Sequence, residues 1–299
     1  LLLIQESGIR DVAVYGRSFI EKGRSVISQQ LVDQMKAKGF TPLFYGFDEP
    51  GGNNKMAEQL MLNQQVHELG AQSINAIFWD DLPSLKNAIN TDTQQFDYLA
   101  VSMGSHGNKR FLNGLPLTEG ERKTKMLAYW HPNVENSVRN KLFMGYWLWA
   151  SGLDGVAPHA YAILPHIAKY KALNSETERG RLSPYNDFSM WDDSKSSFRH
   201  HLSVYPEKEG IISTLHWEAI ADGVTDLILI NQLSDLVEEQ PSAPQHDRAE
   251  ALLKQIKTKS LVKNTSALNA KKTLIYLLLM QEWKAEIKQL IVEYSREAA

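Results

Sequence analysis

The sequence predicts an α/β protein, a (β/α)8 barrel of the TIM type that lacks its first strands in this chain and carries a helical C-terminal extension. Short runs of β-branched and aromatic residues alternate with amphipathic stretches between residues 9 and 161. This alternation is typical of parallel strands joined by helices. From residue 220 onward the chain shows helical periodicity, which predicts a helical C-terminal part.

Six strands are predicted, at residues 11–15, 42–47, 75–79, 98–102, 125–130 and 155–161. A closed barrel of this type needs eight strands. We therefore expect two further strands to precede residue 1, in a missing N-terminal part of the same protein. The first residues agree with this expectation, because they read as the middle of a helix and contain neither a methionine nor a signal peptide.

Two helices are predicted among these strands. In the first, Ile27, Leu31 and Met35 recur every four residues, and Gly39 stands where a helix end favours a left-handed residue. The second carries apolar residues at positions 138, 142, 146 and 149. Residues 171–203 are polar and lack periodicity, and loops of that length are commonly functional.

The C-terminal part is predicted to consist of helices that pack against the barrel. Their apolar positions are Ile220, Val224, Leu227 and Ile228 before a break at 239–244, and Met280, Trp283, Ile287, Leu290 and Tyr294 after it. We therefore divide the chain into a barrel portion, residues 1–235, and a helical extension, residues 236–299.

Composition excludes several classes of function. Of 299 residues, 43% are hydrophobic and 22% charged, and the net charge of −3 comes from acids and bases that are interspersed. A nucleic-acid or anionic-membrane partner is therefore not expected. There is no cysteine, so disulfides and thiolate metal sites are absent. The longest apolar stretch, residues 274–280, is shorter than the roughly 20 residues that cross a bilayer, and no membrane span is predicted.

The segment that carries Asp48 and Glu49 is the most informative part of the sequence. The two acids follow an apolar strand, and Pro50 and Gly51 come directly after them. Proline favours an extended conformation for Glu49, and glycine lets the chain turn out of the barrel, so both acids should stand on the C-terminal rim. Two close carboxylates do not lose their protons together, because the first negative charge raises the pKa of the second group. One of them can therefore remain protonated and act as a general acid. The alternative is that the pair caps the following helix.

Other strand ends supply aromatic and polar side chains that suit a sugar. Together with Tyr45, which belongs to the strand before the acids, the predicted substrate-binding residues are Trp79, Asp80, Tyr129, Trp130, His131, His159 and Tyr161. Structural alternatives stay open, because the tryptophans can fill a core and the aspartate can cap a helix. His159 and Tyr161 can equally have a structural hydrogen-bonding role. The adjacent His200 and His201 lack the spacing of a zinc pair. We predict no metal and no cofactor.

Three ordered segments resemble the glycoside hydrolase family 123 group and its relatives that carry the DUF4091 domain. They are Tyr45–Pro50, then Arg139–Gly145 with Trp149, Gly152, Gly155 and Tyr161, and finally Tyr205–Pro206 with Trp217–Asp226. The resemblance covers residues 45 to about 235. One position departs from the pattern, because Ala221 stands where the family has an arginine.

The resemblance implies a retaining β-N-acetylhexosaminidase that acts on an amino-sugar glycan, with N-acetylgalactosaminides as the best associated substrates. The substrate's own acetamido oxygen would attack the anomeric carbon, Asp48 would orient the acetamide, and Glu49 would act as acid and then base. A periplasmic or secreted location is implied in the same way. Two alternatives stay open, a glycosidase of another sugar specificity and a non-catalytic glycan-binding protein.

Overall fold

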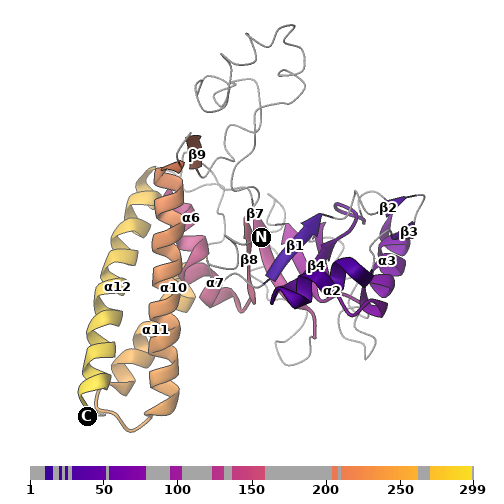
Figure 1. Cartoon of the computed structure of the whole chain (residues 1–299). Coiled ribbons are helices and arrows are strands. Elements are labelled where there is room, and N and C mark those ends of the chain that lie inside the picture. The colour runs from indigo at the N-terminus through magenta and orange to yellow at the C-terminus, as the bar shows by residue number, and fades with distance from the viewer. Residues whose placement is uncertain are drawn as a thin grey trace, which may run out of the picture. The chain divides into compact units, whose positions relative to one another are not determined.

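The structure is a computed structural model that describes residues 11–15, 20–21, 24–25, 29–51, 54–78, 95–102, 123–130, 137–158, 204–207, 210–261 and 270–297. The chain divides into two compact units (Figure 1). Unit 1 comprises residues 1–129 and 153–157, and unit 2 comprises residues 130–152 and 158–299. The boundary expected from the sequence, at residue 235, lies inside a helix of unit 2.

Unit 1 is built on a six-stranded sheet whose spatial order follows the chain. Its strands are β1 (Asp11–Tyr15), β4 (Thr41–Tyr45), β5 (Gln72–Phe78), β6 (Tyr98–Ser102), β7 (Lys125–Trp130) and β8 (Gly155–Pro158). The pairs from β1 to β7 are parallel. Asp154 ties the start of β8 to β7, because its carboxylate accepts from Met126 N–H at 2.7 Å and its own N–H donates to Met126 O at 2.9 Å. A short hairpin joins β2 (Ile20–Glu21) to β3 (Arg24–Ser25).

The predicted barrel is wrong, because this sheet is open. Its order begins at β1 and ends at β8, and these two strands are not neighbours among the described residues. Each of the six predicted strands overlaps an observed one. The sequence pattern indicates local βα units. Open and closed parallel sheets are both built from such units, so the pattern does not distinguish them. Closure depends on strand number, tilt and stagger, which no local pattern records.

Two helices complete the described core of unit 1. The first, α2 (Gln29–Ala37), buries Val32 and Met35 against Phe40 and Phe44. Gly39 follows α2 with a φ of +76°, the left-handed helix end expected from the sequence. The second, α3 (Met56–Glu68), carries polar side chains on its buried face, with Gln59 fully buried and Asn63 nearly so.

Unit 2 is a helical bundle with a small hairpin. Its elements are α6 (Ser137–Met144), α7 (Tyr146–Ser151), β9 (Val204–Glu207), β10 (Gly210–Ser213), α10 (Leu215–Glu239), α11 (His246–Ser260) and α12 (Ala270–Glu297). The long helices α10 and α12 lie side by side (Figure 1). The apolar residues expected on the last helix, from Met280 to Tyr294, are all buried. None of the helices in the described ranges is long and apolar enough to cross a membrane.

The face that α10 buries agrees with the predicted apolar positions only in part. Val224 and Ile228 are exposed, whereas Ile220, Gly223 and Asp226 are buried. Ile220 was among the predicted positions, and the buried glycine and aspartate were not, because an apolar pattern does not indicate that such residues face inward. The predicted second helix is also interrupted, because Gly145 separates α6 from α7.

The two glycines allow backbones to approach closely. A Cβ built on Gly223 would lie 2.6 Å from the Lys141 carbonyl oxygen, and one on Gly145 would lie 2.8 Å from the Gly223 carbonyl oxygen. Neither position can take a side chain without moving backbone, so glycine fixes how near α10 comes to α6.

Beside this contact lies a cluster of four charged side chains, Lys141, Asp222, Asp226 and Lys284. Asp226 is fully buried and lies 3.3 Å from Lys141 Nζ and 2.8 Å from Lys284 Nζ. Asp222 accepts hydrogen bonds from both lysines. Burial raises the pKa of Asp226, whereas the two lysine hydrogen bonds outweigh partial burial and lower the pKa of Asp222. The two lysines balance the two carboxylates, which is what burying these charges requires.

We expect Gly223→Ala to destabilise the protein by about 1–3 kcal/mol, because the added methyl group overpacks the contact with the Lys141 backbone. Thermal and urea denaturation would measure the loss. Val224→Ala, at the adjacent exposed position, is the control and should leave stability nearly unchanged. Equal stability of the Gly223→Ala variant and the wild type would contradict the close packing of α10 on α6.

Candidate functional site

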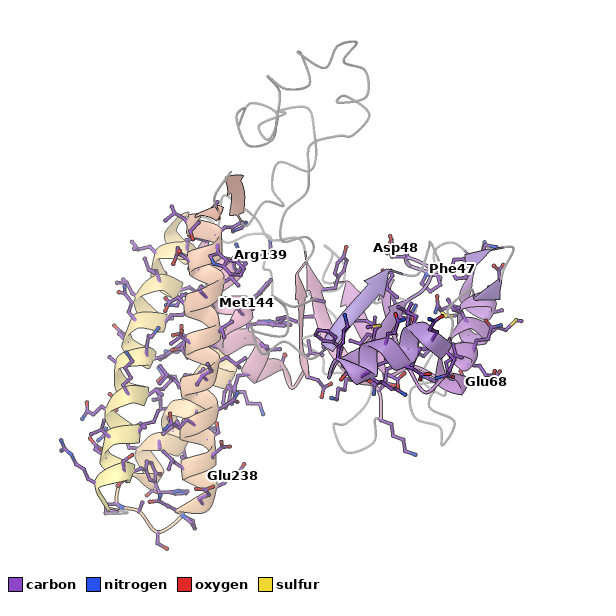
Figure 2. All side chains as sticks on the ribbon, viewed as in Figure 1. Phe47, Asp48, Glu68, Arg139, Met144 and Glu238 are labelled. Atoms are coloured by element: carbon purple, nitrogen blue, oxygen red, sulfur yellow. The ribbon has the colours of Figure 1, made fainter. Side chains whose placement is uncertain are left out.

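The candidate site lies where β4 ends. Tyr45 is the last residue of β4, and Asp48 and Glu49 follow before α3 begins at Met56. Figure 2 shows Asp48 at one edge of unit 1 and Glu68, the last residue of α3, at the opposite edge. The helix therefore returns the chain against the strand direction, and the acids stand at the carboxyl edge of the parallel sheet. Ligands of open α/β sheets commonly bind at this edge.

Glu49 adopts a backbone conformation that is rare for its residue type. Its φ is +46°, in the left-handed region that favours glycine. The extended conformation expected from the following proline is wrong. The chain reverses into α3 directly after this point, and the turn is closed by Lys55 N–H donating to Pro50 O at 2.7 Å. The need to reverse here overrides the local preference of a residue before proline. Such strain persists only where the surrounding structure enforces it.

Tyr45 holds the neighbouring acid. Its hydroxyl donates to Asp48 Oδ1 at 2.6 Å. Burial, and then this hydrogen bond, raise the pKa of Tyr45 well above its usual value. The phenol therefore stays protonated and remains the donor, and it fixes the orientation of a carboxylate that is itself exposed to solvent.

Tyr129 belongs to the same site although it comes from β7. Burial, and then the negative charges of Asp48 and Glu49, raise the pKa of Tyr129 to about 12. Strands β5 and β6 separate β7 from β4, so this influence acts across the carboxyl edge of the sheet. We call Tyr45, Asp48, Glu49 and Tyr129 the carboxylate–tyrosine site. All four were predicted from the sequence as site residues.

The remaining predicted residues cannot be placed in this site. Trp130 is described only as the backbone end of β7. Five others lie outside the described residues, as does the polar segment 171–203: Trp79, Asp80, His131, His159 and Tyr161.

The sequence reading missed the residues that support the site from below. Phe47 N–H donates to Gln59 Oε1 at 2.6 Å, and Gln59 Nε2 donates to Asn63 Oδ1 at 2.7 Å. Both side chains come from α3 and are buried. The signal was present in the sequence, because Gln59, Asn63 and His67 recur every four residues beside the apolar Leu62 and Val66.

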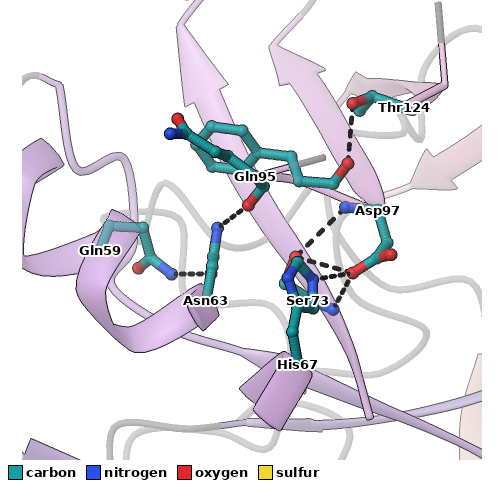
Figure 3. A network of polar contacts seen from close by, with 8 residues as sticks. Gln59, Asn63, His67, Ser73, Gln95, Asp97 and Thr124 are labelled. Carbon is teal, nitrogen blue, oxygen red and sulfur yellow. Dashed lines mark hydrogen bonds and ion pairs between the residues drawn. The ribbon is translucent and has the colours of Figure 1, made fainter. Parts of the chain in front are cut away.

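A second polar cluster involves His67, Ser73 and Asp97 (Figure 3). Asp97 Oδ2 lies 2.6 Å from His67 Nε2, and it accepts from Ser73 N–H at 2.7 Å and from Ser73 Oγ at 3.1 Å. These bonds outweigh burial and lower the pKa of Asp97. The serine and the histidine both contact the same carboxylate oxygen of Asp97. In a nucleophilic triad the serine hydroxyl would instead hydrogen-bond to the histidine. The cluster joins α3 to the starts of β5 and β6 and is structural.

Two further observations concern the kind of site and the kind of protein. No group of three or more His, Asp or Glu side chains suited to a metal ion occurs in the part of the chain that the structure describes. Comparison with known proteins finds no matching family model and no similar curated protein. The fold and the site therefore define an open parallel α/β unit with paired carboxylates and two tyrosines at its carboxyl edge.

We expect Asp48→Asn and Glu49→Gln each to lower the pKa of Tyr129 from about 12 toward its ordinary value near 10. Removing a nearby negative charge makes the tyrosinate easier to form. The 13Cζ chemical shift of Tyr129, followed through alkaline pH, would measure it. Asp33→Asn, at an exposed position on α2, is the control. An unchanged Tyr129 titration in both site variants would show that the three side chains are not neighbours.

Proposed function

We propose that the chain is a glycoside hydrolase in which Asp48 and Glu49 are the catalytic pair. The observation that carries the proposal is the left-handed Glu49 at the carboxyl edge, beside an Asp48 whose carboxylate Tyr45 orients. Strain at a non-glycine residue concentrates at functional sites, because structure that must enforce it is retained for a use. Two acids in one turn supply a proton donor and a charge stabiliser.

The amino-sugar specificity rests on the resemblance of Tyr45–Pro50 to the strand-end motif of glycoside hydrolase family 123. In the proposed reaction the acetamido oxygen of the substrate forms a bond to the anomeric carbon as the bond to the leaving oxygen breaks. Glu49 gives its proton to that leaving oxygen. The ring that forms carries a positive charge, which the Asp48 carboxylate stabilises through the acetamido N–H.

In the second step water attacks the anomeric carbon, Glu49 takes a proton from the water, and the acetamide is restored. Two displacements at one carbon give retention of configuration. Because the substrate supplies the nucleophile, the usual separation of two carboxylates does not apply, and adjacent acids suffice.

The two tyrosines support this chemistry in different ways. Tyr45 fixes Asp48 before substrate binds, so the carboxylate need not reorient as charge develops. Tyr129, whose raised pKa keeps its phenol protonated, can donate a hydrogen bond to an oxygen of the sugar. Its ring also offers an apolar surface to the sugar's apolar face.

One observation favours a second candidate, a glycan-binding protein without turnover. Ala221 stands where the resembling family has an arginine, and its side chain is exposed on α10. A binding protein would keep the carboxylate–tyrosine site and lose catalysis.

We expect the wild type to hydrolyse aryl 2-acetamido-2-deoxy-β-glycosides, and Glu49→Gln to lower kcat by about 100-fold or more through loss of the general acid. Release of the aryl group from a panel of N-acetylgalactosaminide, N-acetylglucosaminide and 2-hydroxy glycosides would measure it. Glu68→Gln, at the opposite edge of unit 1, is the matched control.

The outcomes separate the candidates. A binding protein shows no turnover before mutation, although it still binds the sugar. Hydrolysis of 2-hydroxy glycosides as fast as that of their 2-acetamido counterparts would show that the acetamide is not the nucleophile.

A further inference from the structure

The turn that carries the carboxylates is built against one buried side chain. A Cβ built on Gly46 would lie 2.3 Å from Gln59 Oε1 and 2.4 Å from Gln59 Nε2. The amide of Gln59 is therefore pressed against the Gly46 backbone, and any larger residue at position 46 would displace it. The next backbone N–H, that of Phe47, donates to Gln59 Oε1. Asp48 and Glu49 follow directly.

The orientation of the Gln59 amide is fixed by groups that cannot exchange roles. At one end, Phe47 N–H is only a donor, so it requires the amide oxygen of Gln59. At the other end, the Gln95 carbonyl is only an acceptor, and Asn63 Nδ2 donates to it at 2.8 Å. Asn63 must then present Oδ1 to Gln59 Nε2. Figure 3 shows Gln59, Asn63 and Gln95 in this order.

We propose that Gln59 is a positioning residue for Asp48 and Glu49, oriented for that role by Asn63. The proposal rests on the proposed function, because it states what the buried amide does for the catalytic pair. Gln59 touches neither acid in this account. It acts through the Phe47 backbone, which sets where the following turn begins.

The burial of Gln59 is what makes the arrangement specific. Its side chain is completely inaccessible to water, so a replacement that cannot accept from Phe47 N–H leaves a buried donor unsatisfied. Exposed Gln64, on the same helix, offers a contrast, because its amide donates to Glu68 at 3.1 Å and to no part of the turn.

Gln59→Glu makes the hydrogen bonds at position 59 depend on pH. Protonated glutamic acid has one acceptor and one donor, so it can accept from Phe47 N–H and donate to Asn63 Oδ1. The ionised form still accepts from Phe47 N–H, but it has no donor for Asn63 Oδ1 and places a charge where water has no access. Opening the turn would let water solvate that charge. Burial raises the pKa of the introduced carboxyl, because it disfavours the charged form. The variant should therefore hold the turn at low pH and release it as pH rises through the raised pKa.

We expect the hydrogen-exchange protection factor of Phe47 N–H in Gln59→Glu to match the wild type at about pH 5 and to fall at least tenfold below it at about pH 8. Gln64→Glu is the control and should match the wild type at both values. The ionisable side chains of the turn and of the start of α3, Asp48, Glu49, Lys55 and Glu58, are common to all three proteins, so each variant is compared with the wild type at the same pH. Ser73 N–H reports whether unit 1 stays folded.

The catalytic arm uses aryl 2-acetamido glycosides. At about pH 8 the kcat of the Gln59→Glu variant should be about 10- to 100-fold below that of the wild type, with a smaller change in KM. At about pH 5 the kcat of the variant should equal that of the wild type at the same pH. Phe47 protection that stays at the wild-type value at both pH values overturns the proposal. So does a loss of protection with unchanged kcat. A wild type that hydrolyses no glycoside overturns the proposed function instead, and Phe47 exchange still decides whether Gln59 holds the turn.

Discussion

The hydrogen bond from Phe47 N–H to the buried Gln59 amide is the contact on which the site of unit 1 depends. It sets the point at which the chain leaves β4, and the strained Glu49 follows two residues later. A buried polar side chain is costly unless all its groups are paired. Asn63 and the Gln95 carbonyl complete that pairing. The site and the core of α3 are therefore parts of one arrangement.

Unit 2 buries polar groups by a different device. Its four-charge cluster pairs Asp226, which is fully buried, with Lys141 and Lys284. Removing one partner would leave a buried charge uncompensated, which typically costs several kcal/mol. The glycines at 145 and 223 bring the backbones close enough for the cluster to close. Polar burial in unit 1 contacts the turn before Asp48 and Glu49, and in unit 2 it joins α6, α10 and α12.

Features that depend on neighbouring residues could be predicted from the sequence, and features that depend on distant residues could not. Strand positions followed from residue type, and Asp48 was predicted at the strand end because the turn signal lies beside it. The open sheet could not be told from a barrel, because closure depends on pairing between distant strands. The left-handed Glu49 contradicted the effect of Pro50, since the reversal into α3 imposes it. Gln59 was missed because a glutamine in a helix normally faces solvent.

The most direct test of the central claim, an amino-sugar hydrolase centred on Asp48 and Glu49, is the affinity of a thiazoline mimic of the cyclised acetamide. Isothermal calorimetry would compare the mimic with the product sugar in the wild type and in Asp48→Asn. The account predicts that the mimic binds the wild type about 100-fold or more tightly than the sugar, and that Asp48→Asn removes most of this preference. Equal affinity for mimic and sugar, or a preference that survives Asp48→Asn, would contradict it.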